Sequence, residues 1–515
     1  MDPQILAEIK DYLSKNEIRF QEELLEEYST DASFLTRGVP PLAIFLATEE
    51  QAVRVVDFLA PRSIPAAIRA MGSSTAGSAL ADEESVLLLV EGLGVCDPWG
   101  NRTIFVPPVL TTADGIPIPP AQLDGYRRNP NLLREAEIYA RVPAGLSTDE
   151  LTRLLRPYHL QPAVVPSSGW SAIAANFSTN AGGNGSPTYG TFKDIVTRIR
   201  IVGTDIPPRA KVVTVRDRQK ISSMAGHQGL LGIITELDVR VVFRVPDEEL
   251  LSAVITCESK DISLLGAEVG AFMDEAQKNC QMINAEFMVI DSLIAESSDP
   301  LSSDPELGQF FSLDPDHWKM LVLYQGQRSL MQRLPQIAAS YPGIQYREIS
   351  ASGLKKMLEV RKAAAGKATG RVGIPGFEDI FVRDPKKLGK VLAKIFEISM
   401  GDLPGRPYGH QYVNGLVIHY RPLAALDASE IERAWALTRR LNQEVLGSSE
   451  YAAEKRVEHG LGLELFALSP PERIEELVRL KKEFDPAMIF STFLMDPQPK
   501  ADFVGRQLQG LQTGR

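Results

Sequence analysis

The 515-residue sequence has few cysteines, no excess of positive charge and no long apolar run. Its three cysteines, Cys96, Cys257 and Cys280, are far apart and form no C-x-x-C pair, which argues against an iron–sulfur cluster or a zinc knuckle. The formal net charge of −11 argues against nucleic acid as the main partner. Because no run of about 18 apolar residues is present, we expect no membrane span and a cytoplasmic protein, peripheral to a membrane only through a partner.

The remaining composition, 44% hydrophobic and 23% charged, is that of a globular protein, and the length suggests two or three domains. After about residue 245, apolar strand patterns such as LVIHYRP alternate with longer helical patterns, which is typical of an antiparallel sheet covered by helices. We predict an α+β fold with a first domain over 1–245, a second over 246–445 and a C-terminal segment over 446–515. The first domain contains a proline-rich stretch at 97–131, which is either a surface insertion or a lid or partner contact.

Two stretches of the first domain are crowded with small residues, RAMGSSTAGSA at 69–79 and SAIAANFSTNAGGNG at 171–185. Glycine lets a backbone approach a ligand closely, and successive N–H groups in such turns form anion-binding nests. Neither stretch fits G-x-x-x-x-G-K-[ST] or a G-x-G-x-x-G that opens a helix, so a nucleoside triphosphatase loop and a Rossmann site are not indicated. The pair favours a diphosphate site, although either stretch alone would more often be an ordinary loop.

These stretches resemble motifs of the flavin-dependent oxidoreductases of the vanillyl-alcohol oxidase type. Arg69-Ala-Met-Gly-Ser-Ser-Thr-Ala-Gly77 is similar to their R-G-x-G-T-x-x-x-G loop, and Ile173-Ala-Ala-Asn-Phe-Ser-Thr-Asn-Ala-Gly-Gly183 to their T-I-G-G-N-x-x-T-N-A-G-G run. Gly226-His-Gln-Gly-Leu-Leu-Gly-Ile-Ile-Thr235 is similar to G-S-E-G-T-L-G-I-I-T. The resemblance covers about residues 25–495 outside the proline-rich stretch, and it is strongest to the D-lactate, glycolate and D-2-hydroxyglutarate dehydrogenase branch.

The resemblance implies a PCMH-type FAD-binding domain of two α+β subdomains, a cap domain for the substrate, and a C-terminal segment that completes the active site. It also implies noncovalent FAD, because Ser73 stands where many relatives carry the histidine that attaches the flavin. The residues that it implies for FAD binding are Arg69, Met71, Gly72, Ser73, Ser74, Thr75, Ala76, Gly77, Ser78, Pro166, Ser167, Ala174, Asn176, Ser178, Thr179, Gly182, Gly183, Ile233 and Ile234.

Three of the six histidines lie in the second half beside candidate partners: His410 in YGHQY, His419 in VIHYR and His459 in VEHGLG. A lone histidine is more often structural, but imidazole and carboxylate together suit Zn²⁺, Mn²⁺ or Fe²⁺. In the resembling branch, G-H-x-G-D-G-N-L-H and E-H-G-I-G supply two histidines and a glutamate to a divalent metal. The resemblance implies the same role for His410, His419 and Glu458, although His410 and His419 are nine residues apart where the pattern has seven.

By the same resemblance, His459 accepts the proton of the substrate hydroxyl, and Arg361 in LEVRKAAAG pairs with the substrate carboxylate. The predicted function is therefore FAD-dependent oxidation of a 2-hydroxy acid to the 2-oxo acid, by a dehydrogenase rather than an oxidase. The alternatives are an oxidase of a sugar, alditol or phenol on the same scaffold, and an electron-relay subunit of a larger flavoprotein complex. We expect an electron acceptor such as an iron–sulfur subunit, an electron-transfer flavoprotein or a quinone, and a homo-oligomer is an open alternative to a monomer.

Overall fold

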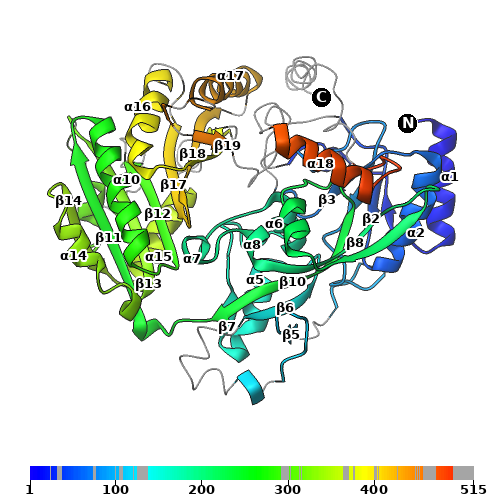
Figure 1. Cartoon of the computed structure of the whole chain (residues 1–515). Coiled ribbons are helices and arrows are strands. Elements are labelled where there is room, and N and C mark those ends of the chain that lie inside the picture. Colours follow the sequence, from blue (N-terminus) through cyan, green and yellow to red (C-terminus); the bar gives the residue numbers. More distant parts are fainter. Residues whose placement is uncertain are drawn as a thin grey trace. The chain divides into compact units, whose positions relative to one another are not determined.

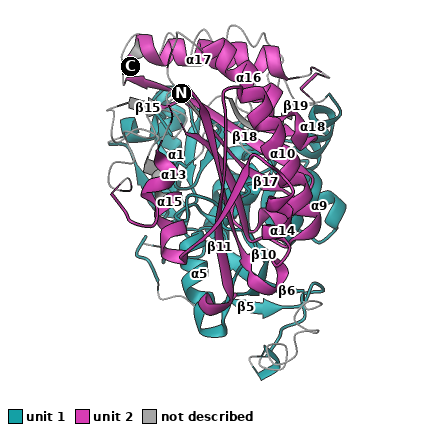
Figure 2. Cartoon of the chain, turned by 90° about the vertical axis from the view of Figure 1, so that its left-hand side faces the viewer, with its two compact units in different colours: residues 1–182, 191–244, 457–515 teal, residues 183–190, 245–456 magenta. Residues whose placement is uncertain are grey.

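The computed structural model of the chain places most of the sequence. The residues that it describes are 1–23, 25–31, 38–73, 77–98, 100–103, 108–119, 121–123, 137–290, 301, 303–312, 314, 316–363, 371–374, 377–399, 403, 405–425, 427–446, 448, 450–451, 453–455 and 471–490. The chain divides into two compact units (Figure 2). Unit 1 comprises residues 1–182, 191–244 and 457–515, and unit 2 comprises residues 183–190 and 245–456.

The first half of unit 1 is a small four-stranded sheet with helices. Its elements are α1 (Pro3–Lys15), β1 (Phe20–Gln21), η1 (Leu25–Tyr28), β2 (Ala43–Phe45), α2 (Glu49–Leu59), η2 (Ala60–Arg62), β3 (Ala66–Arg69) and β4 (Val86–Leu89). The strand order is β1-β2-β4-β3, and β4 runs parallel to both β2 and β3. Because parallel strands end at the same edge, the connections that follow β2, β3 and β4 emerge together there.

The second half of unit 1 is an antiparallel sheet (Figure 1). Its elements are β5 (Val109–Thr111), β6 (Ile138–Pro143), α5 (Thr148–Leu155), η3 (Arg156–Tyr158), β7 (Leu160–Pro162), α6 (Ile173–Thr179), α8 (Phe192–Ile195), β8 (Val196–Thr204), β9 (Ala210–Val215), α9 (Arg218–Met224), β10 (Ile233–Phe243) and α18 (Pro471–Phe484). The order is β5-β6-β10-β8-β9, and β7 also pairs with β10. The stretch LSTDELTRLLRPYHL at 146–160, which has a Ser/Thr start and an acidic first turn, predicts a helix, and the structure has α5 there, begun by a Ser147–Glu150 capping box.

Unit 2 is built on a long antiparallel sheet with the order β14-β11-β13-β12-β17-β18-β16-β19, and β15 pairs with β18. Its elements are α7 (Ser186–Tyr189), η4 (Asp247–Glu249), β11 (Leu250–Ser259), α10 (Ile262–Asn279), β12 (Asn284–Ile290), α13 (Gly308–Phe311), β13 (Trp318–Gln327), η5 (Arg328–Leu330), α14 (Leu334–Ala339), β14 (Ile344–Ile349), α15 (Ala351–Ala363), β15 (Arg371–Gly373), β16 (Phe377–Val382), η6 (Pro385–Lys387), α16 (Leu388–Ser399), β17 (Gly405–Tyr412), β18 (Gly415–Ala425), α17 (Ala428–Val445) and β19 (Ala453–Lys455). The antiparallel sheet with helices, and thus the α+β class, is confirmed.

Two helices of unit 2, α10 and α16, approach each other closely because glycines lie between them. A Cβ atom at Gly389 of α16 would lie 1.8 Å from the carbonyl oxygen of Ser263, and one at Gly266 of α10 would lie 2.5 Å from the Cα of Gly389. Neither contact can be relieved by a side-chain rotation, because the atoms that would be struck belong to backbones.

We expect Gly389→Val to lower the free energy of unfolding by about 3 kcal/mol, because the two helices would have to separate. Urea unfolding followed by circular dichroism measures this loss. Lys390→Val is the control, since Lys390 is exposed on the same helix and the substitution carries the same β-branched side chain. Equal losses in the two variants would show that helix propensity, rather than close packing, causes the effect.

Candidate functional site

The first small-residue turn follows β3 directly. Arg69 ends that strand, and its Nη1 donates a hydrogen bond to the carbonyl oxygen of Thr30 at 2.9 Å. Gly72 and Gly77 adopt positive φ angles of 70° and 71°, which glycine tolerates without strain. A Cβ atom at Gly72 would lie 2.4 Å from Nη2 of Arg69, so a larger residue would displace the guanidinium. Ser74, Thr75 and Ala76 lie outside the described residues, whereas Met71 and Ser73 belong to the described part of this turn.

A hydrogen bond joins the end of this turn to a loop 150 residues further along the chain. The hydroxyl of Ser78 donates to Oε1 of Gln228 at 2.6 Å, and both side chains are buried. The loop, Gly226–Gly232, contains three glycines at positive φ, and Gln228 also adopts a positive φ of 54°. The first and third sequence motifs therefore meet inside unit 1.

The second small-residue stretch meets the same loop. Its first half is the helix α6 and not the continuous turn that we predicted, since Ala172 begins the helix and Asn180, at a φ of 53°, ends it. The backbone N–H of Gln228 donates to the carbonyl oxygen of Ser178 at 2.8 Å, and the hydroxyl of Ser178 lies 3.3 Å from Nε2 of His227. All three motifs thus converge at residues 226–228.

Two further predicted cofactor residues, both on α6, have side chains that bind other protein groups. The amide nitrogen of Asn176 donates to the hydroxyl of Thr148 at 2.9 Å, and the hydroxyl of Thr179 donates to the carbonyl oxygen of Ala175 at 3.0 Å. Ala174 lies beside them on α6. These hydrogen bonds already engage both side chains. A cofactor that contacts Asn176 or Thr179 therefore has to share the same amide or hydroxyl group.

The other predicted cofactor residues occupy separate positions. Pro166 and Ser167 lie in the connection between β7 and α6, and Ile233 and Ile234 begin β10, where they pair with β8. Gly182 ends a segment of unit 1, whereas Gly183 begins the short segment of unit 2. The N–H of Gly183 donates to the hydroxyl of Ser186 at 2.9 Å.

The loop at 226–228 holds two buried polar atoms that have no hydrogen-bond partner, Nδ1 of His227 and Nε2 of Gln228. Leaving such a group unpaired costs about 1–3 kcal/mol, so the pair indicates a ligand with polar atoms at this point. Burial, and then the positive charges of Arg473 and Lys481, lower the pKa of His227 to about 3, which makes the ring neutral at pH 7. This point fits a polar cofactor. Neither residue was predicted from the sequence, where the only signal is that His227-Gln228 replaces Ser-Glu of the resembling motif.

A second group of candidate residues lies on the sheet of unit 2. His410 on β17 and His419 on β18 are buried, and their ring centroids are 5.2 Å apart. Tyr408 stacks on His419 with centroids 4.9 Å apart and an angle of 27° between the rings. Glu286 on β12 pairs with His410 across the strands, and its Oε1 lies 3.7 Å from Nδ1 of His410.

The β-hairpin explains the nine-residue spacing of the two histidines. His410 pairs with Val417, and His419 pairs with Tyr408, so the histidines lie on the same face in adjacent strands, two positions apart in register. The hairpin therefore brings the histidines together without an inserted bulge. Glu286 was not predicted, because strand pairing with β12 is not visible in the sequence.

The structure describes less of the remaining residues that were predicted to be catalytic or to bind a metal. Glu458 and His459 lie outside the described residues, and Arg361 lies in α15, where only the backbone is described. Within the described residues, no group of three or more His, Cys, Asp or Glu side chains is arranged to hold a metal ion. Among the same residues, no helix is long and apolar enough to cross a membrane.

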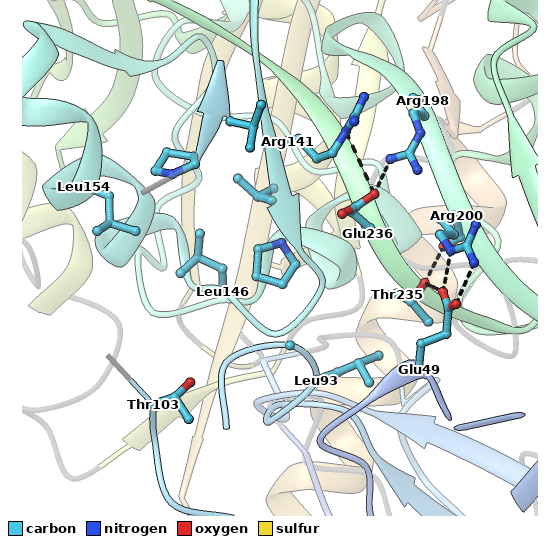
Figure 3. A pocket seen from close by; sticks show the side chains of 15 residues that line it. Glu49, Leu93, Thr103, Arg141, Leu146, Leu154, Arg198, Arg200, Thr235 and Glu236 are labelled. Atoms are coloured by element: carbon cyan, nitrogen blue, oxygen red, sulfur yellow. Dashed lines mark hydrogen bonds and ion pairs between the residues drawn. The ribbon is translucent and has the colours of Figure 1, made fainter. Parts of the chain in front are cut away.

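Unit 1 also contains a cavity of about 590 Å³ that the sequence did not predict (Figure 3). One wall is apolar, with Leu93, Leu146 and Leu154, and the opposite wall is charged, with Glu49, Arg200 and Glu236 among its residues. None of the predicted cofactor residues lines it. Its volume is in the range of small-molecule sites, and its charged wall consists of ion pairs.

Comparisons with known proteins agree with a flavin-binding fold. Residues 124–205 match the family model of an FAD binding domain. The chain is also similar to the solved structures of alkyldihydroxyacetonephosphate synthase in P1 and in P212121. The first has a TM-score of 0.64 and 13% identity over 96% of this chain and 86% of that chain. The second has a TM-score of 0.63 and 13% identity over 95% of this chain and 84% of that chain.

No curated protein matches the chain by sequence. At 13% identity, the similarity to the solved structures shows the fold alone. The domain match supports FAD as the cofactor and an FAD-dependent enzyme. Neither comparison points to the D-lactate and glycolate branch or to a bound metal.

Proposed function

We propose that the chain is an FAD-dependent oxidoreductase that oxidises a 2-hydroxy acid to the 2-oxo acid. The observation that carries the cofactor assignment is the convergence of three distant motifs at Gln228, through its bonds to Ser78 and Ser178. The match of residues 124–205 to an FAD binding domain supports the same cofactor. The turn after β3 holds the diphosphate, because it offers backbone N–H groups and hydroxyls without bulky side chains.

The residues of the chain have distinct roles in this proposal. When bound, FAD accepts the two electrons of the oxidation as a hydride. Arg361 pairs with the substrate carboxylate, a contact that an arginine makes through two parallel hydrogen bonds. His459 takes the proton of the substrate hydroxyl, and the proposed role of His410 and His419 is to act on that hydroxyl, either directly or as ligands of a divalent metal with Glu458.

A second candidate function is oxidation of a phenol on the same scaffold. Oxidation of a sugar or an alditol belongs to the same alternative. The observation that favours it is the ring of Tyr408, which stacks on His419 beside the buried His410. In this proposal the ring also stacks on a flat phenolic substrate, a contact from which a small hydroxy acid gains little. In both cases the electrons pass on to an external acceptor.

The test is the absorbance of the purified chain and its response to substrates. We expect the protein to bind FAD, to show the absorbance of oxidised flavin, and to bleach without oxygen when D-lactate or glycolate is added. Bleaching by a 4-substituted phenol or by xylitol, and not by either acid, would support the second candidate. The same assay after chelation tests the metal, since a metal bound to His410, His419 and Glu458 would be needed for fast bleaching. A folded chain that does not bind FAD would contradict the proposed function as a whole.

A further inference from the structure

The carboxylate of Glu49 in the charged wall of the cavity joins the two halves of unit 1 (Figure 3). It accepts hydrogen bonds from Nε and Nη2 of Arg200 on β8, at 2.6 and 2.7 Å. It also accepts a hydrogen bond from the hydroxyl of Thr235 on β10, at 2.7 Å. One side chain of the four-stranded half therefore holds two neighbouring strands of the antiparallel half.

Thr235 directly follows Ile233 and Ile234, the backbone that is expected to contact the cofactor. The pairing of β10 with β8 shifts between Ile234 and Glu236, so Thr235 lies at an irregularity where the ladder alone does not set the backbone. Its carbonyl oxygen accepts the N–H of Ala144 at 3.0 Å, and its hydroxyl is held by Glu49. The position of this backbone thus depends on contacts from outside the β8–β10 ladder.

Glu49 is also linked, through backbone contacts, to the predicted diphosphate turn after β3. It is the first residue of α2, after the N-cap Thr48, and the carbonyl oxygen of Ala47 accepts the N–H of Gly94 at 2.8 Å. Gly94 belongs to the connection after β4, and Arg69, which begins the turn, pairs with Leu89 at the end of β4. A short series of backbone contacts therefore runs from the turn through β4 to Glu49.

We propose that Glu49 is a positioning residue for the cofactor, which fixes the Ile233–Thr235 backbone at a set distance from Arg69–Ser73, the start of the turn after β3. This inference rests on the proposed function, because it supposes that one FAD molecule contacts both segments. Nothing in the sequence motifs indicates Glu49, which looks like an ordinary acidic residue in the first turn of a helix.

The charge of Glu49 makes the proposal testable by pH. Hydrogen bonding from Arg200 lowers the pKa of Glu49, burial opposes this, and the bond from Thr235 lowers the pKa further. Arg198 on β8 also favours the ionised form, Glu236 on β10 is the nearby acid, and Glu50 on the same helix is paired with Arg54. With a lowered pKa, the ionised contact is complete above the ordinary carboxyl range and is lost as the pH falls through the lowered value.

The experiment measures the Kd of FAD for the apoprotein by flavin fluorescence, for the wild type, Glu49→Ala, Glu49→Gln and the control Val55→Ala. Val55 is buried on the same helix and takes no part in the hydrogen bonds of Glu49 to Arg200 and Thr235, so its truncation removes packing of α2 and leaves those bonds in place. We expect Glu49→Ala to raise the Kd about tenfold or more, and Val55→Ala to leave it within about twofold at a similar loss of stability in urea. Glu49→Gln imitates the protonated side chain. The Kd of the wild type should therefore rise towards that of Glu49→Gln as the pH falls.

Equal Kd changes in Glu49→Ala and Val55→Ala, or a ratio between Glu49→Gln and wild type that does not depend on pH, would overturn the inference. Failure of the wild type to bind FAD would instead refute the proposed function, which is a separate and recognisable outcome. Adding Thr235→Val tests the contact itself, because its effect on the Kd should be smaller in the Glu49→Ala background than in the wild type.

Discussion

Replacing Lys481 with methionine is expected to lower the free energy of unfolding by about 3–5 kcal/mol, because it leaves a buried carboxylate without its positively charged partner. Lys481 on α18 and Asp485 just after it are both fully buried in unit 1. The ammonium donates to the Asp485 carboxylate and to the carbonyl oxygens of Leu230, at 2.9 Å, and Phe490, at 2.6 Å. Methionine has a similar length and no donor, so all three acceptors lose that partner at once.

Urea unfolding of the apoprotein measures this effect. Lys482→Met is the matched control, since Lys482 is exposed at the next position of the same helix, and it should change stability by no more than about 0.5 kcal/mol. In the double variant Lys481→Met with Asp485→Leu, part of the loss should be recovered because the unpaired charge is gone. Equal stability of the two single variants would contradict the prediction.

The same ion pair shows where a pattern of residues predicts structure well and where it does not. Apolar spacing in PPERIEELVRLKKEF and the following Asp485-Pro486 predict α18 and its end, and the structure confirms both. Nothing in that pattern distinguishes Lys481 from Lys482, since lysine is almost never fully buried. Only the tertiary structure separates them, because the acceptor at Leu230 comes from a loop about 250 residues earlier in the chain.

The candidate cofactor site was predictable to a similar degree. The small residues at Gly72 and Gly77 are forced by backbone conformation, which is a local property, and the sequence therefore identified the turn. The resemblance implied Ser78 as a cofactor residue, but its partner Gln228 was not predicted, because a contact across 150 residues leaves no local pattern. Glu49 was missed for the same reason.

The histidines of unit 2 show a third case, in which the residues were identified and the geometry was not. His410 and His419 are nine residues apart where the resembling motif has seven, and this spacing alone does not show whether they meet. The register of β17 and β18 pairs His410 with Val417, and this places His419 on the same face, two positions further along β18. A period of two along each strand explains the contact once the turn of the hairpin is known.

The largest effect on catalysis is expected from His459→Asn, which should slow the bleaching of the bound flavin by substrate about 10²–10⁴-fold, the usual contribution of a positioned base. His459 lies outside the described residues, so this prediction follows from the E-H-G-x-G pattern and from the proposed role as proton acceptor. Anaerobic stopped-flow absorbance measures the rate, and the Kd of FAD should stay the same, since His459 is assigned to the substrate.

His159→Asn is the matched control for this variant. His159 ends the η3 helix of unit 1 at a φ of 56°, and asparagine accepts that conformation well, so the control makes the same chemical change without strain. A loss of rate that becomes smaller at high pH would support a base, because hydroxide then replaces the missing proton acceptor. Bleaching of His459→Asn at the wild-type rate would remove His459 from the mechanism, and the next candidates for proton acceptor would be His410 and His419, which lie together on the sheet of unit 2.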